Sequence, residues 1–241
     1  PDGLQQAETD GRLLKVGEAV DRFYVLENNG IYQSDAEVPV KDGRKMTVNG
    51  VELKAGDPKW VDKNGDNKIT DEDKVLKGHS LPKYTGGFST QLKFKRFDLG
   101  ASFFFAAGQS AMNYRAYQQY DFTTLDKGDN LAGVKEIFFW QSGNVPMDYP
   151  RYNALSEVHP YRADQDLYLE KVSYLKLRSV TLGYSVPTAK HSVYVYVSGN
   201  NLFTVTNFSG DDPELVDFDG YYRGYGMGIP RSVTLGVRCS F

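Results

Sequence analysis

The last eleven residues, Arg231 to Phe241, read RSVTLGVRCSF and alternate strictly between polar and apolar side chains. Successive side chains of a β-strand point to opposite faces, so this segment predicts one apolar and one polar face. The apolar face would carry Val233, Leu235, Val237, Cys239 and Phe241. Such alternation is typical of a transmembrane β-barrel strand, with apolar groups toward lipid and polar groups toward the lumen, and a terminal aromatic residue suits that class.

Bulk composition would instead suggest a protein that needs no membrane. The 241 residues are 40% hydrophobic, and the mean hydropathy is -0.49. The sequence holds no run of about eighteen apolar residues, so we expect no transmembrane helix. A barrel escapes that test because only every second residue of its strands must be apolar.

Charge and cysteine content limit the possible partners. The net charge of -3 gives no support for nucleic-acid binding. The single cysteine, Cys239, excludes an intrachain disulfide, and its apolar phase predicts a wall residue rather than a nucleophile. The 17 Tyr, 14 Phe and 2 Trp suit the aromatic girdles of a membrane protein, and equally a carbohydrate-binding β-protein. The chain starts at Pro1 without a signal peptide, so we expect a piece of a longer protein.

Period-two patterns predict further strands before the last one. Residues 84–108 read as a hairpin around a tight Lys95–Arg96 turn, and Gly108 is expected to end it. Residues 168–186 form another strand, in which a phase slip near Arg178–Ser179 predicts a bulge. A strand from 193 to 203 follows the short turn 187–190.

Long connections alternate with these short turns. Residues 109–167 and 206–230 are long and rich in aromatic residues, glycine and proline. Outer-membrane barrels have short periplasmic turns and long extracellular loops, so the two segments are predicted to lie outside the cell. We therefore divide the chain into 1–83, a weak strand (11–26) plus an external loop, and 84–241, the last five or six strands of a large antiparallel barrel.

Residues 62–73, DKNGDNKITDED, match the spacing of an EF-hand calcium loop. Ca²⁺ takes six to eight oxygen ligands, which this spacing supplies from one short segment. The predicted metal ligands are Asp62, Asn64, Asp66, Lys68 (through its carbonyl oxygen), Thr70 and Asp73. Position six is Asn67 instead of Gly, and position twelve is Asp73 instead of Glu. We expect a structural Ca²⁺ that braces the loop; the alternative is a polar turn without metal.

No catalytic arrangement stands out. The three histidines, His79, His159 and His191, lack the spacing of metal ligands, and we expect them at the surface or in turns. The cluster Asp211–Glu214 offers a carboxylate pair, but a loop turn or helix cap is the more common role of such residues. We therefore predict that the protein is not an enzyme.

Several stretches together resemble one family. They are Val16–Ala19, Asn29–Gln33, Gly56–Lys59 leading into Asp62–Asp73, Tyr84–Phe88, Phe97–Leu99, Tyr174–Tyr184, Ser198–Thr204, Asp212–Glu214 and Pro230–Val237. In order and spacing, the chain resembles the C-terminal part of the SusC/RagA-type TonB-dependent outer-membrane transporters of the Bacteroidota.

The resemblance implies an importer of oligosaccharides or peptides, in the outer membrane of a Gram-negative bacterium. It implies a SusD-like surface lipoprotein as a lid, and TonB acting on a plug region that is not in this sequence. Because five or six strands cannot close so wide a barrel, the remaining strands and the plug would come from the same protein or a companion chain. No substrate-binding residue is assigned.

Two other readings use the same residues. A soluble, calcium-braced β-sandwich that binds carbohydrate would turn its apolar faces into a core. A small self-sufficient porin fits less well, because the loops are long for so few strands. The exposure of residues such as Leu235 and Phe241 separates the barrel from the sandwich.

Overall fold

The structure is a computed structural model of the chain, and it describes residues 6–9, 12–120, 140–141, 149–151, 156–188 and 192–240. The chain divides into two compact units. The first comprises Pro1–His79, Met112–Leu169 and Tyr221–Arg223; the second comprises Ser80–Ala111, Glu170–Gly220 and Gly224–Phe241. Each unit has its own architecture.

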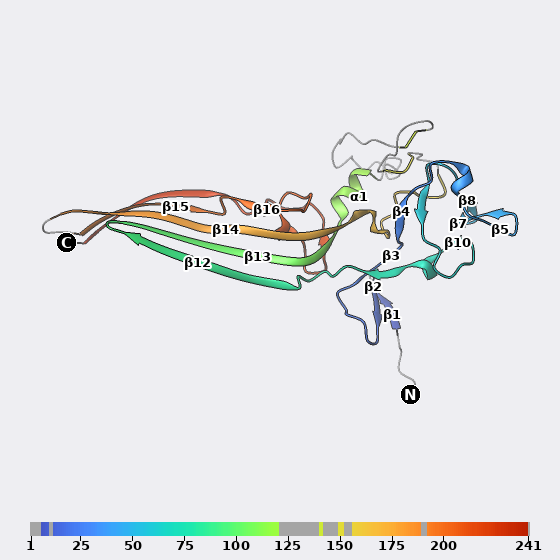
Figure 1. The fold of residues 1–241 in the computed structure, drawn as a ribbon, viewed down its shortest axis with the longest axis horizontal. Coiled ribbons are helices and arrows are strands. Elements are labelled where there is room, and N and C mark those ends of the chain that lie inside the picture. Colours follow the sequence, from blue (N-terminus) through green and yellow to red (C-terminus); the bar gives the residue numbers. More distant parts are fainter. Residues whose placement is uncertain are drawn as a thin grey trace. The chain divides into compact units, whose positions relative to one another are not determined.

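The second unit is a wall of long antiparallel strands. They are β12 (Tyr84–Phe94), β13 (Phe97–Asn113), β14 (Leu169–Val186), β15 (Ser192–Asn200) and β18 (Ser232–Ser240). They are hydrogen-bonded in that order, and the short β16 (Thr204–Thr206) pairs with β14. In Figure 1, β12 to β15 run side by side along most of their length. Each is at least as long as the roughly nine residues that a tilted strand needs to cross a bilayer.

Tight turns join the strands at one end of this wall. The β12–β13 register runs without a break from Phe94↔Phe97 to Tyr84↔Ala107. Lys95 closes that hairpin with a φ of 56°, a left-handed conformation that tight turns use. Figure 1 shows the C-terminus at the same end of the strands as this turn. The short turn at Lys95–Arg96 and the C-terminal end of β18 therefore lie at the same end of the strands, while the predicted turn 187–190 lies partly outside the described residues.

The sequence predicts that the strand ends at Gly108, but it does not end there. The φ of Gly108 is 79°, yet β13 continues to Asn113 and the helix α1 (Tyr114–Tyr120) follows at once. A Cβ on Gly108 would lie 3.1 Å from the Cβ of Lys83. Glycine therefore allows the backbone to take this irregular conformation without ending the strand. The long connection predicted for 109–167 thus begins later, and much of it lies outside the described residues.

The first unit is built from short strands and turns. Its strands are β1 (Gln6–Thr9), β2 (Arg12–Lys15), β3 (Phe23–Val25), β4 (Asn28–Ile31), β5 (Val40–Lys41), β6 (Arg44–Lys45), β7 (Thr47–Val48), β8 (Val51–Glu52), β9 (Pro58–Trp60), β10 (Lys68–Ile69), β11 (Val75–Lys77) and β17 (Tyr221–Tyr222). They pair in small ribbons, such as β3 with β11 and β4 with β9. The 3₁₀ segments are Asp35–Glu37, Asp71–Asp73 and Asp166–Tyr168 in this unit, and Pro213–Leu215 in the second.

Two apolar clusters hold the first unit together. One consists of Leu26, Tyr32, Val38, Met46, Val48, Leu53, Trp60, Ile69 and Val158. The other consists of Phe23, Val25, Met112, Tyr161 and Tyr168. Residues 27–83, predicted as an external loop, therefore carry short strands and side chains of a hydrophobic core. Likewise, the predicted loop 206–230 contains a 3₁₀ segment and β17.

Candidate functional site

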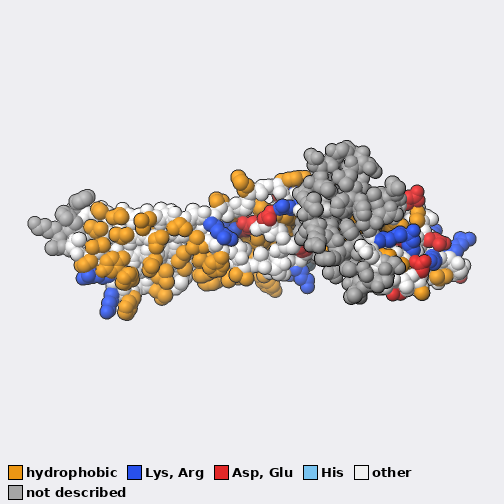
Figure 2. All heavy atoms as spheres, turned by 90° about the horizontal axis from the view of Figure 1, so that it is seen from above, with side chains coloured by type: hydrophobic (Ala, Val, Ile, Leu, Met, Phe, Trp, Pro, Cys, Tyr) orange, Lys and Arg blue, Asp and Glu red, His pale blue; other side chains and the backbone are white. Residues whose placement is uncertain are grey.

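The two faces of the strand wall differ in chemistry. Val233, Leu235 and Val237 of β18 are 71%, 76% and 61% exposed. Arg238 lines a hollow on the opposite face, so its neighbours in β18 point away from that hollow. Figure 2 shows hydrophobic side chains gathered on one surface of the long strands. The predicted outward direction of the apolar residues of β18 is confirmed; Phe241 lies outside the described residues.

The hollow on the other face has a volume of about 830 Å³ and a polar lining. Hydroxyl and amide side chains dominate that lining: Ser89, Thr90, Gln91, Ser102, Ser179, Thr181 and Ser185. Lys93, Asp98 and Arg238 add charges of both signs. This face therefore offers donors and acceptors to a hydrophilic solute without a strong net charge.

A tyrosine pair crosses the hollow, and glycines make room for it. Tyr194 and Tyr196 stack with ring centroids 5.8 Å apart. A Cβ on Gly183 would lie 1.7 Å from the Tyr194 hydroxyl oxygen, so only glycine lets this ring lie flat across β14. Gly236 makes the same room for Tyr196, with 2.3 Å to its Cζ. The Tyr194 hydroxyl thereby reaches Asp98 on β13 and donates a 2.6 Å hydrogen bond.

Buried charges attach the segment after β16 to the wall. Lys176 is only 1% exposed, and its Nζ lies 3.2 Å from Asp212 Oδ2 and also binds Glu214. Arg178 binds both oxygens of Glu214, and its guanidinium carbon lies 5.0 Å above the Phe104 ring. The carboxylates considered for catalysis in the sequence are thus paired with buried or half-buried cations.

The pairing of β14 becomes irregular near Arg178–Ser179, where the sequence predicts a bulge. Phe104 alternates with its strand neighbours so that it shares the face of Ser102, which lines the hollow. Arg178 stacks on Phe104, and the next residue, Ser179, also lines the hollow. Lys176 pairs with Thr204 and Ser179 pairs with Asn200, so three residues of the partner segment, 201–203, lie opposite two residues of β14. The extra residue is therefore in the partner segment and not in β14.

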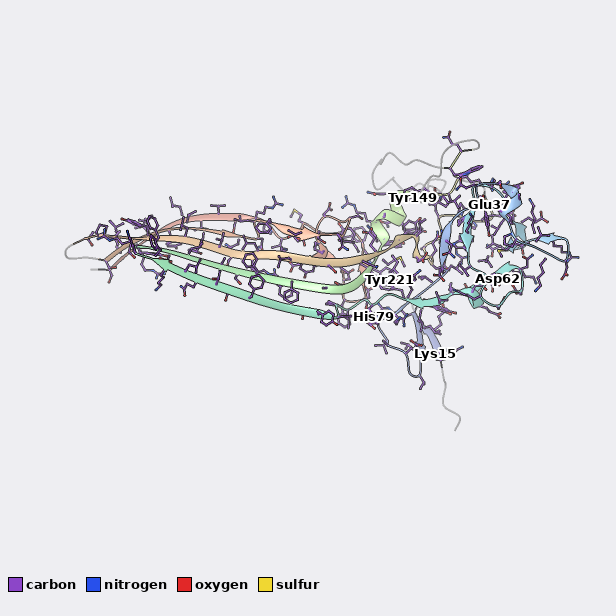
Figure 3. All side chains as sticks on the ribbon, in the orientation of Figure 1. Lys15, Glu37, Asp62, His79, Tyr149 and Tyr221 are labelled. Atoms are coloured by element: carbon purple, nitrogen blue, oxygen red, sulfur yellow. The ribbon has the colours of Figure 1, made fainter. Side chains whose placement is uncertain are left out.

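The predicted calcium loop is folded as a series of side-chain-to-backbone turns. Asp62 accepts the N–H groups of Gly65 (2.6 Å) and Asn67 (2.7 Å) through its two oxygens. Asn64 Oδ1 accepts from Asp66 N at 2.9 Å, and Asp66 Oδ1 accepts from the N–H of Lys68 at 2.8 Å. Figure 3 shows Asp62 in the part of the first unit that contains β10.

Two features of this loop bear on a metal ion. Asn67 has a φ of 65°, the left-handed conformation that glycine takes at position six of such loops. Asp73, at position twelve, is fully buried, and its oxygens accept the N–H groups of Lys63 and Thr70, both at 2.8 Å. The Thr70 hydroxyl in turn caps the 3₁₀ segment Asp71–Asp73. The side-chain oxygens of Asp62, Asn64 and Asp66 thus accept backbone N–H groups, as those of Asp73 do, and Asp73 differs from them in being fully buried.

Within the described residues, no group of three or more His, Cys, Asp or Glu side chains is placed to hold a metal ion. His79 lies 3.1 Å from Asp21, and His159 occupies a turn with a φ of 49°. His191 lies outside the described residues.

Ion pairs connect the early part of the first unit with residues just before β14. Glu27 binds Lys63 (2.7 Å) and Lys77 (3.4 Å), and Lys77 also binds Asp166 at 2.5 Å. The hydrogen bond from Lys63 holds the pKa of Glu27 below its ordinary value. The hydrogen bond to Asp166 raises the pKa of Lys77. Both shifts favour the charged forms that make these contacts.

A fully buried carboxylate anchors another segment of this unit. Asp57 is 0% exposed and accepts from Arg151 Nε at 2.8 Å and from Lys54 N at 2.9 Å. The preceding Gly56 has a φ of 88°, and a Cβ there would lie 2.5 Å from the Trp140 ring. Glycine is thus needed both for the turn and for the close approach of Trp140.

Comparisons with known proteins agree with this architecture. No protein-family model matches the chain. TonB-dependent receptor P3 of Formosa agariphila is 30% identical over 211 residues, which are 84% of this chain and 19% of that protein. TonB-dependent receptor SusC of Bacteroides thetaiotaomicron is 25% identical over 239 residues, or 94% of this chain and 20% of SusC. The chain spans about a fifth of the length of these relatives.

Solved structures show the same fold. The match to the RagAB peptide importer in its open-open state covers 100% of this chain and 24% of the importer chain, with a TM-score of 0.70 and 21% sequence identity. The match to the closed-closed state covers 98% of this chain and 25% of the importer chain, with a TM-score of 0.64 and 19% sequence identity. This chain is homologous to a segment of the SusC-type TonB-dependent receptors. The family and the antiparallel barrel fold predicted from the sequence are confirmed.

In this SusC-type segment, sequence reasoning missed the residues whose partners are remote in the chain. Lys176 meets Asp212 and Glu214, and Asp57 meets Arg151, but no local pattern links them. One signal was present, because Lys176 sits inside an otherwise apolar strand pattern, where a lysine needs a partner. Among the described residues, no helix is long and apolar enough to cross a membrane.

Proposed function

We propose that this chain forms part of the wall and of the external loops of an outer-membrane, TonB-dependent importer. One observation carries the proposal: a single antiparallel sheet exposes an apolar face and lines an open polar hollow on the other. Lipid is the solvent that suits such an apolar face, and an aqueous lumen suits the polar one. The SusC-type relatives support a location in the outer membrane.

The proposed mechanism is passage without chemistry on the solute. The hydroxyl groups of the hollow replace the hydrogen bonds that a hydrophilic solute makes with water. The tyrosine pair Tyr194 and Tyr196 adds flat surfaces on which sugar rings or peptide side chains can pack. The relatives are named as receptors and importers, which agrees with the expectation that the protein is not an enzyme.

The partners follow from the same proposal. β12 and β18 lie at the two edges of the strand order, and an open edge in lipid leaves backbone groups without hydrogen bonds. Further strands must therefore pair with these edges, and we propose that a plug from the same importer fills the barrel and that TonB acts through it. We propose oligosaccharides or peptides as the solute and a SusD-like lipoprotein as the external lid. The likeness to the RagAB peptide importer supports the peptide alternative.

Cysteine labelling in cells tests the assignment of the two faces. Thr181 lines the hollow, and its neighbour Leu182 is 47% exposed on the other face. In a full-length receptor carrying Cys239→Ser, a small water-soluble maleimide should label Thr181→Cys when the outer membrane is permeabilised. Leu182→Cys should stay unlabelled, because lipid excludes the reagent. Preferential labelling of Leu182→Cys would contradict the wall model, and recovery of the native receptor without detergent would favour the soluble sandwich.

We also propose that Ca²⁺ braces the loop 62–73. The left-handed Asn67 and the oxygen groups of Asp62, Asn64 and Asp66 support it, and the ion would neutralise carboxylates that lie close in sequence. Asp62→Ala combined with Asp66→Ala should make residues 57–75 sensitive to protease, as a chelator should in the unaltered receptor. Glu52→Ala, an exposed carboxylate in β8, is the control. Equal sensitivity with and without chelator would rule out a bracing ion.

A further inference from the structure

A second hollow lies beside the β5–β6 hairpin of the first unit. It has a volume of about 550 Å³. Four cationic side chains line it: Lys41, Arg44, Lys45 and Lys68. Figure 2 shows Lys and Arg side chains, with some Asp and Glu, at the end of the molecule where Figure 1 places β5. We refer to this feature as the basic hollow.

The basic hollow also contains two carboxylates, Asp42 and Asp66. Four positive and two negative side chains leave a net charge of +2 on the lining. Asp66 is partly committed, because its Oδ1 accepts the N–H of Lys68 at 2.8 Å. Cations therefore outnumber carboxylates by two to one in the lining of the hollow.

The cations differ in how they are held. Lys45 lies 3.4 Å from Asp35, and Lys41 donates to the Gly65 carbonyl oxygen at 2.5 Å. Arg44 and Lys68 are exposed, and within the described residues neither side chain has a hydrogen bond or an ion pair. Two cations therefore remain available to a ligand.

The backbone around these cations is well defined. Asp42 and Gly43 have φ values of 51° and 72°, which suit a tight hairpin turn. The Asn67 side chain donates to the Arg44 carbonyl oxygen at 3.0 Å and ties the hairpin to the loop 62–73. A prearranged backbone lowers the entropy cost of ordering a ligand.

We propose that the basic hollow binds a sulfate or phosphate ester carried on a sugar. The guanidinium of Arg44 can donate two parallel hydrogen bonds to such a group, and Lys68 can supply a point charge. A volume of this size accepts the ester with an attached sugar ring. The anion site is argued from residues of the first unit alone, whereas the choice of a sugar as the carrier of the ester rests on the proposed function.

Binding measurements on the full-length receptor in detergent test the proposal. Glucose 6-phosphate and glucose 6-sulfate should bind at low ionic strength, whereas glucose should not. Arg44→Gln combined with Lys68→Gln should weaken ester binding about tenfold or more, because each of the two substitutions removes a charge-assisted hydrogen bond to the ester. The control, Lys15→Gln with Lys54→Gln, removes the same charge from exposed positions outside the hollow (Lys15 is labelled in Figure 3) and should leave binding within about twofold.

The competing outcomes are distinct. Equal weakening by both double variants would reduce the effect to general charge attraction and overturn the proposal, as would binding of glucose as tightly as its esters. Unchanged melting of each variant shows that the fold is intact. Competition then identifies the source of the ester: displacement by dextran sulfate but not dextran indicates a soluble saccharide, and displacement by lipopolysaccharide alone indicates the membrane's own glycolipid.

Discussion

Replacing Lys176 with methionine is the sharpest test of the charge network on the wall. The methionine keeps the apolar stem in place but removes the ammonium that lies 3.2 Å from Asp212 and also binds Glu214. Both carboxylate side chains are only 11% exposed, so water cannot replace the lost partner fully. Removing one member of a buried ion pair costs about 3–5 kcal/mol. We expect most of this lost free energy to destabilise the segment around Pro213, which would then detach locally from the strands.

Amide hydrogen exchange in the full-length receptor measures this release. The N–H of Leu215 donates to the Asp212 carbonyl oxygen at 3.1 Å, so its exchange reports opening of the 3₁₀ segment. A cost of about 3–5 kcal/mol corresponds to exchange roughly 100-fold to 1,000-fold faster, or more. Lys171→Met, at an exposed position of the same strand, is the control and should leave exchange unchanged.

A second variant separates charge from packing. Asp212→Asn keeps the side-chain oxygen that caps the 3₁₀ segment, where Asp212 accepts from Glu214 N at 3.0 Å. Combined with Lys176→Met, it removes one charge of each sign and should recover much of the protection. Exchange in Lys176→Met within about threefold of the control would refute the reasoning, because Asp212 would then be buried without a cation at almost no cost, while Glu214 keeps Arg178.

Three other variants test features of the two units. Gly183→Val should expel the Tyr194 ring and lower barrel stability by about 1–3 kcal/mol, seen as a lower temperature for loss of the folded band in gel electrophoresis. Gly56→Ala should cost about 1–3 kcal/mol, because alanine is strained at a φ of 88° and its Cβ would meet Trp140; faster proteolysis of the first unit measures this. The lysine partners of Glu27 lower the pKa of its carboxyl group, so its ion pairs stabilise the folded state above pH 4.5, the ordinary pKa of the group. This stabilisation is lost as the pH falls below 4.5 and through the lowered pKa. Near-ultraviolet circular dichroism should show the loss, and Glu27→Gln should remove this part of the pH dependence.

The wall was predictable from sequence because each of its strands is long and meets two different environments. Nine residues of β18 alternate without exception, and a shift of one residue would turn every apolar side chain inward. Such a pattern indicates, for each residue, which environment its side chain faces. It can be interpreted without knowing which residues of other strands contact that side chain. The irregularity near Arg178 could be placed for the same reason, because it interrupts a regular period, but the pairing shows that the extra residue lies in the partner segment 201–203.

The first unit could not be predicted in this way. Its strands β5 to β8 have two residues each, which is too short to show any period. Its core joins Leu26 with Val158, residues far apart in the sequence. A composition rich in glycine, aspartate and asparagine therefore read as a loop, although the segment buries a hydrophobic cluster.

The polar contacts show the limit most clearly. Lys176 could be recognised as a cation in an apolar strand, but its partners lie 36 and 38 residues away, after β15 and β16. The same holds for Asp57 and Arg151, which are 94 residues apart. A strand pattern states which face a side chain takes, whereas an ion pair depends on where a second segment returns to that face. The residues that hold the segments between the strands in place therefore become visible only once the path of the chain is known.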